Sequence, residues 1–181
     1  AQSGLGASSS FTVGLLNCVN AMKGKIPTKR QLANEALEIE QKKSREFVGS
    51  QDQYAAAFGG FNVINFSKNS IQVNSIPNNL KNIKELEDST VLIFSDFQRK
   101  ASLVEKKKIN NIKKKKIFYE KIQSITNNAE KLLTRSDNIV RDFSELLNEY
   151  WYLKKNLSDN VSNQKINNLI KYCLDSGAEG S

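Results

Sequence analysis

The chain has 181 residues, of which 39% are hydrophobic and 25% are charged, and it carries a formal net charge of +8 with no histidine. This composition is typical of a globular protein with one or two small cores and excludes fibrous, disordered and membrane-spanning classes. The lack of histidine also excludes histidine general bases and histidine zinc ligands, so a proton acceptor must be a carboxylate, a lysine or a tyrosine. We expect a cytoplasmic protein with no membrane partner.

A loop of small residues opens the chain and runs directly into an apolar segment. Glycines let backbone N–H groups approach an anion, and the positive end of a following helix favours negative charge. The loop lacks the lysine of a Walker A element and the third glycine of a dinucleotide fingerprint. It therefore predicts another type of polyphosphate site, formed by Gly4, Leu5, Gly6, Ala7, Ser8, Ser9 and Ser10.

The apolar segment predicts a helix from Ser9 or Ser10 to about Ala21. Its apolar positions are too many for one stripe, so we expect a helix that is buried on most sides. Cys18 in this helix and Cys173 near the end of the chain have no thiol or histidine close in sequence. We expect both thiols to be buried and reduced.

A second helix is predicted to begin after Thr28. Thr28 and Gln31 have the spacing of a capping box, and Pro27 and Leu32 have that of a hydrophobic staple. The apolar positions that follow keep helical spacing, so this helix should run to about Lys43.

A short helix and a hairpin are predicted next. The alanine-rich segment after Asp52 favours a helix that begins at or after that residue. Residues 61–66 and 71–76 are rich in β-branched and aromatic side chains, and a polar turn separates them. This pattern predicts a β-hairpin.

The second half of the chain is predicted to be mainly helical. Residues 77–89 are polar and contain a proline, so we place the boundary between two lobes there. Residues 90–95 indicate a buried strand that opens the second lobe. Two later helices follow from apolar residues at helical spacing, beginning at Ile139 and at Ile166.

Four blocks of the sequence together resemble one known family. They are residues 4–16 (GLGASSSFTVGLL), 48–60 (VGSQDQYAAAFGG), 94–102 (FSDFQRKAS) and 150–158 (YWYLKKNLS). These blocks are similar to those of the GHMP kinases and, among them, of the D-glycero-D-manno-heptose 7-phosphate 1-kinases. The likeness extends over nearly the whole chain.

The resemblance implies an α+β fold with two lobes, both incomplete in this chain. Residues 1–80 would be part of an ATP-binding lobe with the ribosomal-protein S5 domain 2-like fold. Residues 81–181 would be part of a ferredoxin-like C-terminal lobe. Because the chain starts inside the phosphate motif and stops before a further glycine-rich motif of the family, we expect it to have little or no kinase activity by itself.

The resemblance also implies an activity and its cofactors. The intact protein would use ATP and Mg²⁺ to phosphorylate a sugar hydroxyl, most simply C1 of D-glycero-D-manno-heptose 7-phosphate. A phosphorylated sugar would then be the substrate. The loop at residues 4–10 would hold the triphosphate.

A serine and an acid would hold the metal ion in such a site. By resemblance, Ser8 and Glu40 are assigned to magnesium, which keeps several waters and needs only one or two protein oxygens. Glu35 and Glu38 lie on the same predicted helix and compete with Glu40 for this role.

Asp52 is assigned by resemblance as the catalytic base that accepts the hydroxyl proton. An aspartate at the start of a helix is also a common N-cap, and the two interpretations are compatible. Gly49 and Gln51 flank Asp52 and are assigned to the substrate. Arg99 and Lys155 lie in the later blocks and are candidates for binding the phosphate of the acceptor.

Two alternatives remain open at this point. A GHMP kinase could act on fucose, another sugar or a mevalonate-like alcohol, since a fold does not fix its substrate. The lysine runs at residues 106–108 and 113–116 could instead belong to a non-catalytic module that binds nucleic acid. Because no aromatic-interleaved basic surface accompanies these runs, we favour a solvated helix face and expect no nucleic-acid partner.

Overall fold

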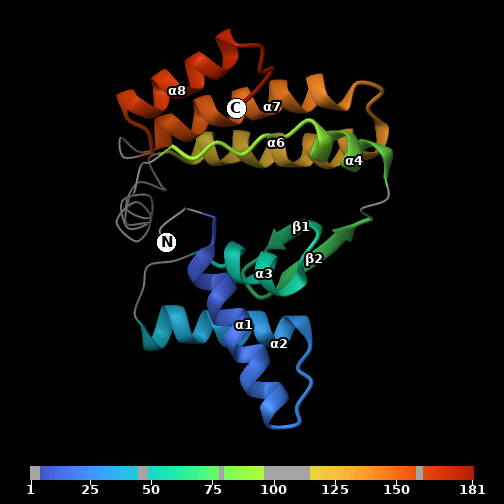
Figure 1. Ribbon diagram of the computed structural model, residues 1–181, viewed down its shortest axis with the longest axis vertical. Helices are drawn as coiled ribbons and strands as arrows, with labels where there is room; N and C mark the ends of the chain where they lie inside the picture. The colour runs from blue at the N-terminus through green and yellow to red at the C-terminus, as the bar shows by residue number, and fades with distance from the viewer. Residues whose placement is uncertain (1–4, 45–48, 78–79, 96–114, 158–160) are drawn as a thin grey trace. The chain divides into compact units, whose positions relative to one another are not determined.

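The computed structural model describes residues 5–44, 49–77, 80–95, 115–157 and 161–181 (Figure 1). Its contacts divide the chain into two compact units. Unit 1 is formed by residues 1–77 with 98–105, and unit 2 by residues 78–97 with 106–181. The described part of the chain contains both helices and an antiparallel strand pair, which confirms the predicted α+β class.

Unit 1 is built from helices that pack on one another and a hairpin. Its elements are α1 (Ala7–Met22), α2 (Lys29–Leu37), the π-helix η1 (Glu38–Lys43), α3 (Gln51–Phe58), β1 (Phe61–Phe66) and β2 (Ile71–Ile76). Helix α1 crosses α2, and α3 packs against both (Figure 1). The core between them is formed by Val13, Leu32 and Ala36, with Leu16, Ala56 and Ala57 packed around it.

The start of α2 follows the predicted capping box. Thr28 Oγ1 accepts a hydrogen bond from the backbone N–H of Gln31, and the Thr28 N–H donates to Gln31 Oε1 at 2.8 Å. The helical path continues to Lys43 as predicted, but its last six residues form the π-helix η1. A π turn widens the helix and changes which side chains face inward, and such turns occur often at functional sites.

The hairpin has the predicted bounds. Phe61 pairs with Ile76, and Phe66 pairs with Ile71 in an antiparallel register. In the connecting turn the backbone N–H of Ser67 donates to the backbone oxygen of Ser70 at 2.9 Å. The guanidinium group of Arg30 on α2 donates to the backbone oxygen of Ile71 and so ties the hairpin to that helix.

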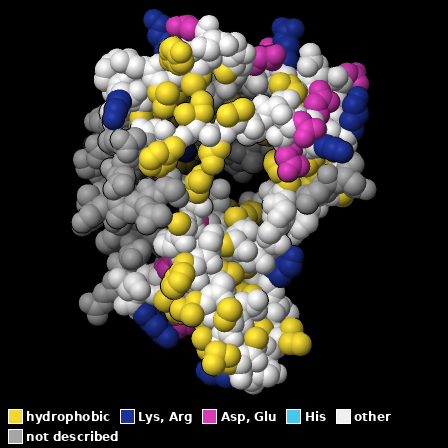
Figure 2. All heavy atoms as spheres, in the orientation of Figure 1, with side chains coloured by type: hydrophobic (Ala, Val, Ile, Leu, Met, Phe, Trp, Pro, Cys, Tyr) yellow, Lys and Arg dark blue, Asp and Glu magenta, His cyan; other side chains and the backbone are white. Residues whose placement is uncertain are grey.

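Helix α1 is much more exposed than its sequence indicates, and the prediction of burial on most sides is wrong. Its buried residues are Ser9 and Val13, whereas Phe11 is 70% exposed and Met22 is 87% exposed. Figure 2 shows hydrophobic side chains on the surface of this unit. Periodicity counts apolar positions, but how many of them are covered depends on which elements pack against the helix.

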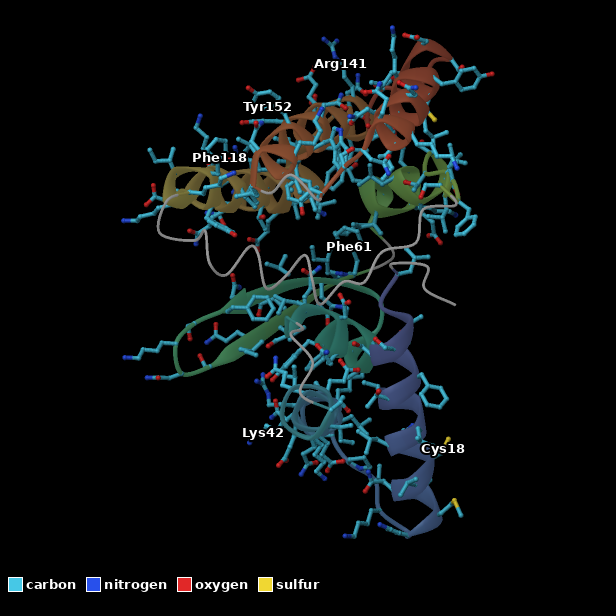
Figure 3. All side chains as sticks on the ribbon, turned by 90° about the vertical axis from the view of Figure 1, so that its left-hand side faces the viewer. Cys18, Lys42, Phe61, Phe118, Arg141 and Tyr152 are labelled. Carbon is cyan, nitrogen blue, oxygen red and sulfur yellow. The ribbon has the colours of Figure 1, made fainter. Side chains whose placement is uncertain are left out.

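The prediction of buried thiols fails at Cys18, which is exposed on α1, with its sulfur directed away from the helix (Figure 3). Cys173 on α8 (Gln164–Asp175) is partly exposed. Both thiols are free, as predicted.

Unit 2 contains α4 (Lys81–Asp88), α6 (Lys116–Arg135), α7 (Ile139–Leu157) and α8 (Gln164–Asp175) among its described residues. The last two agree with the predicted helices. A short link joins α6 to α7 as a helical hairpin, and α4 packs against both (Figure 1). Their buried apolar side chains include Ile83, Ile125, Leu133, Ile139 and Leu153. Across the described helices of the chain, no stretch is both long and apolar enough to cross a bilayer.

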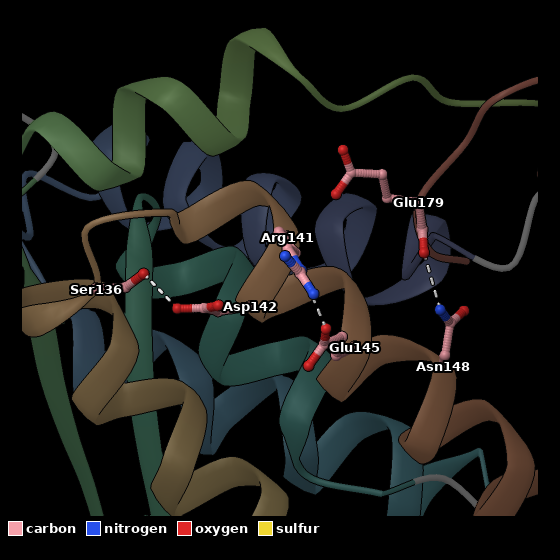
Figure 4. Close-up of polar contacts among 6 residues, drawn as sticks. All are labelled: Ser136, Arg141, Asp142, Glu145, Asn148 and Glu179. Atoms are coloured by element: carbon pink, nitrogen blue, oxygen red, sulfur yellow. Dashed lines mark hydrogen bonds and ion pairs between the residues drawn. The ribbon is translucent and has the colours of Figure 1, made fainter.

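Polar contacts fix the start of α7 and hold the last residues of the chain against this helix (Figure 4). The Ser136 hydroxyl donates to Asp142 Oδ2 at 2.7 Å, and it accepts from the backbone N–H of Asn138. Farther along α7, the amide of Asn148 donates to the backbone oxygen of Glu179 at 2.9 Å. The last residues therefore lie against α7, where a Cβ on Gly180 would approach the Ser144 backbone oxygen to 2.6 Å.

The prediction of a strand at the start of unit 2 is wrong. Residues 90–95 form no strand, and Val91 and Phe94 are 80% and 69% exposed. A strand needs a partner for its backbone groups, and within the described residues the pairing is confined to β1 and β2. The two units divide between residues 77 and 78, at the start of the polar segment 77–89, and that segment also contains the amphipathic helix α4, whose Ile83 is buried.

Candidate functional site

The loop at the start of α1 has the backbone form of an anion site. Gly6 is the N-cap of α1 with φ of 67°, a left-handed conformation that favours glycine. No side chain caps this helix end and no acidic residue lies in its first turn. The first N–H groups of an α-helix have no partner within the helix, so the start of α1 can donate to an anion.

Asp52 lies beside this loop. It is in the first turn of α3, after the N-cap Ser50, so it is not itself the N-cap. A Cβ built on Gly6 would lie 3.4 Å from Asp52 Cγ and 3.5 Å from its Oδ2. The fold thus brings an exposed carboxyl group from α3 next to the glycine turn that precedes α1, although Gly6 and Asp52 are 46 residues apart in the sequence.

Glu40 forms a buried polar cluster with side chains from two other helices. Glu40 is 4% exposed, Ser9 is 3% exposed and Gln53 is 1% exposed. The Ser9 hydroxyl donates to Glu40 Oε2 at 3.1 Å, and Gln53 Nε2 donates to the same oxygen. Glu40 in η1 is therefore held from α1 on one side and from α3 on the other.

Two oxygens of this cluster have no hydrogen-bond partner. They are Glu40 Oε1 and Gln53 Oε1, both buried. An unsatisfied buried acceptor costs about 1–3 kcal/mol, and neither oxygen carries a proton that it could donate when Glu40 is ionised. A carboxylate and an amide oxygen are ligands that hard divalent cations prefer, so this donor set fits a magnesium ion or its bound water.

The other two acids considered for the metal lie elsewhere on the helix. Glu35 is exposed and accepts a hydrogen bond from Asn20 at 3.4 Å. Glu38 is exposed and forms an ion pair of 4.0 Å with Lys42. The structure therefore brings Glu40 to the first turn of α1, and the contacting serine is Ser9, whereas Ser8 is exposed.

Tyr54, the residue after Gln53, fixes helix α3 to α2. Tyr54 is 2% exposed and its hydroxyl donates to Asn34 Oδ1 at 2.7 Å. Its ring stacks on Phe58 with centroids 6.0 Å apart. Lys29 Nζ donates to the backbone oxygen of Phe58 at 2.6 Å, which caps the C-terminal end of α3. These contacts determine where Asp52 and Gln53 lie.

Some of the remaining predicted site residues lie near the start of α1 or α3, and others lie outside the described residues. Leu5, Ala7 and Ser10 are exposed around the start of α1, and Gly49 and Gln51 are exposed before and at the start of α3. Gly4 and Arg99 lie outside the described residues.

Lys155 is on α7 in unit 2, and its ammonium group lies 5.6 Å from the ring centroid of Trp151. Of the lysine runs, residues 106–108, 113 and 114 lie outside the described residues, as Arg99 does. The structure thus brings together the part of the predicted site that lies on α1, η1 and α3.

Sequence reasoning did not identify Gln53, Tyr54 and Asn34 as residues that organise the site. The first two stand in the block 48–60 that carries the resemblance, but nothing in their spacing shows that they are buried. Their neighbours in space come from η1 and α2. A signal was nevertheless present, because four consecutive polar or aromatic residues open a helix that is otherwise rich in alanine.

Comparisons with known proteins place this geometry in context. Residues 1–60 match the model of the GHMP kinases N-terminal domain. The chain is 35% identical over 182 residues to the D-glycero-alpha-D-manno-heptose 7-phosphate kinase of Campylobacter jejuni, an alignment that covers 97% of this chain and 52% of that protein. The crystal structure of a D-glycero-D-manno-heptose 1-phosphate kinase from Bacteroides thetaiotaomicron matches with a TM-score of 0.64 and 31% identity, over 86% of this chain and 45% of that chain. The chain thus spans about half the length of these relatives.

Proposed function

Residues 1–60 belong to the N-terminal domain of the GHMP kinases, and from this premise we propose that the full-length protein transfers the γ-phosphoryl group of ATP to a sugar hydroxyl. The observation that carries the proposal is the position of the Asp52 carboxyl group beside Gly6 at the start of α1. A group that can accept a proton lies next to a group of backbone donors that can hold phosphates.

The roles of the residues follow from this arrangement. The free N–H groups at the start of α1, in the loop at residues 4–10, hold the triphosphate. Asp52 orients the acceptor hydroxyl and takes its proton, while the hydroxyl oxygen forms a bond to the γ-phosphorus. The bond between the γ-phosphorus and the bridging oxygen breaks, and ADP leaves with that electron pair. The backbone donors need no reorganisation during this step, which is how preorganised sites lower a barrier.

The buried cluster supplies the site for a divalent cation. We assign Glu40, through its unpartnered Oε1, and Ser8 on the exposed side of the first turn of α1 as the residues that would hold Mg²⁺. When bound, the ion neutralises charge on the phosphates. Ser9 has a different role, because its hydroxyl is used on Glu40 Oε2 and so orients that carboxyl group.

For the acceptor, we propose a heptose 7-phosphate that is phosphorylated at C1. The support is the 35% identity to a protein named as a D-glycero-alpha-D-manno-heptose 7-phosphate kinase. Gly49 and Gln51 are the substrate residues next to Asp52, and Arg99 and Lys155 would bind the phosphate of the sugar. Cytoplasmic location and the two lobe folds, ribosomal-protein S5 domain 2-like and ferredoxin-like, are part of the same proposal.

The substitution Asp52→Asn in the full-length protein tests the mechanism. It keeps the size of the side chain and removes the proton acceptor, so turnover with heptose 7-phosphate should fall by at least about 100-fold while ATP still binds. Phosphate transfer and ATP binding are measured separately. The control is Asp88→Asn on the exposed face of α4, which should leave both unchanged.

Two results would contradict this proposal. Retained turnover in Asp52→Asn removes Asp52 from the role of base. Equal or greater turnover with fucose or a mevalonate-like alcohol in the unsubstituted protein keeps the kinase but replaces the acceptor.

A further inference from the structure

Gln53 has a polar side chain, but this side chain is buried and does not contact solvent. It is 1% exposed and stands in the first turn of α3, directly after Asp52. Successive helix residues point about 100° apart, so one turn of α3 presents Asp52 to Gly6 and Gln53 to Glu40. The same turn therefore contacts both the phosphate loop and the buried acid.

The amide of Gln53 determines which oxygen of Glu40 remains free. Gln53 Nε2 and the Ser9 hydroxyl both donate to Oε2 of Glu40. Two donors on one carboxylate oxygen fix the plane of the group and leave Oε1 as the oxygen without a partner. Gln53 Oε1 is buried and has no hydrogen-bond partner either. The two oxygens without partners therefore belong to Glu40 and Gln53, two side chains that are hydrogen-bonded to each other.

We propose that Gln53 is a positioning residue for the divalent cation of this site. Its amide N–H holds Glu40 so that Oε1 can take Mg²⁺, and its amide oxygen accepts a hydrogen bond from a water molecule bound to that ion. The inference rests on the proposed kinase function, because it requires a cation at Glu40. It adds a residue that couples the metal to the helix that carries Asp52.

The test measures how ATP binding depends on Mg²⁺ in the full-length protein. Gln53→Met keeps an unbranched side chain of similar length and removes both the donor and the acceptor. The Mg²⁺ concentration that gives half-maximal ATP binding should rise roughly tenfold, as it does when partners that orient metal ligands are removed elsewhere. ATP affinity in EDTA should stay within about twofold of the unsubstituted protein, because the backbone donors of α1 do not depend on Gln53.

Two further variants keep this test decisive. Gln53→Asn retains the amide but is one methylene shorter, so it should raise the Mg²⁺ requirement in the same direction and serves if Gln53→Met does not fold. Gln72→Met on β2 is the matched control, since Gln72 is exposed and should leave the Mg²⁺ dependence unchanged.

The possible results separate this inference from the proposed function. If both Gln53 variants lower only the melting temperature and leave the Mg²⁺ dependence unchanged, Gln53 is a packing residue and the inference is overturned while the kinase proposal stands. If ATP binding by the unsubstituted full-length protein does not respond to Mg²⁺, there is no cation site at Glu40. This result would contradict both the proposed kinase mechanism and the role of Gln53.

Discussion

Consecutive residues at the start of α3 contact different parts of unit 1. Asp52 lies beside Gly6, Gln53 donates to Glu40, and Tyr54 donates to Asn34. Each contact reaches a different element, because neighbouring side chains on a helix point in different directions. The first turn of α3 therefore contacts the glycine turn before α1, the π-helix and α2. This density of contacts explains why substitutions only one residue apart should have different effects.

Gly6→Ala is a prediction at the residue scale. A side chain in the left-handed region costs about 1–2 kcal/mol, and the new Cβ would lie 3.4 Å from the Asp52 side chain. We expect both the free energy of unfolding and the affinity for ATP to decrease. Thermal unfolding and ATP titration measure the two effects in the full-length protein.

Gly24→Ala is the matched control for this substitution. Gly24 has the same φ of 67°, and a Cβ there would meet nothing within 4 Å. It should lower stability by a similar amount without changing ATP affinity. If both variants bind ATP as well as the unsubstituted protein does, the loop at Gly6 is not the phosphate site.

The elements of unit 1 were predicted best where the signal is local. The capping box of Thr28 and Gln31 lies within one helical turn, and the polar turn of the hairpin lies within four residues, so sequence neighbours fix both. The π-helix was not predicted. The bond from the backbone N–H of Ser44 to the Ile39 oxygen, which widens the last turn, competes with an α-helical bond of similar strength, and local propensity does not separate the two.

Tyr54→Phe is a prediction at the scale of the helix. It removes the hydroxyl that donates to Asn34 and keeps the buried ring against Phe58. Because a net hydrogen bond contributes about 0.5–1.5 kcal/mol and Asn34 Oδ1 loses its partner, we expect a loss of about 1 kcal/mol in the free energy of unfolding. Urea denaturation followed by circular dichroism measures it.

Two comparisons make this measurement specific. Tyr152→Phe should leave the free energy of unfolding unchanged, since Tyr152 is 63% exposed. Adding Asn34→Ala to Tyr54→Phe should cost less than the sum of the single changes, because both remove the same bond. Full additivity would mean that this bond does not hold α3 on α2.

At the scale of the whole molecule, the core of unit 1 is small and lies between three helices. Val13, Leu32 and Ala36 are buried there. In contrast, α1 has an exposed apolar face with Phe11, Leu15 and Met22, each more than half exposed. The contribution of α1 to the hydrophobic stabilisation of this unit therefore comes from one face of the helix, because only area removed from water contributes.

Leu32→Ala and Met22→Ala together test this distribution in the chain described here. Leu32 is 7% exposed and packs in the core, so its truncation should cost about 2–5 kcal/mol. Met22 is 87% exposed, and its truncation should change stability by no more than about 0.5 kcal/mol. Chemical denaturation of the two variants gives the comparison. Similar losses at both positions would show that the apolar face of α1 is covered in solution.

The sequence by itself determined the local elements, and it predicted residues for the candidate site. These elements follow from neighbours within a few residues of each other. They are the helix after Gly6, the cap at Thr28, the hairpin at 61–66 and 71–76, and the helices that begin at Ile139 and near Ile166. For such features the chain supplies both the donor and the acceptor locally.

Only the tertiary structure decided which side chains meet and which stay exposed. It brought Asp52 to Gly6, put Ser9 and Gln53 on Glu40, left Cys18 and Phe11 exposed, and gave residues 90–95 no strand. These outcomes depend on partners 13 to 46 residues away or on elements that do or do not cover a face. Burial and long-range contacts are properties of packing, and periodicity in a single segment does not specify them.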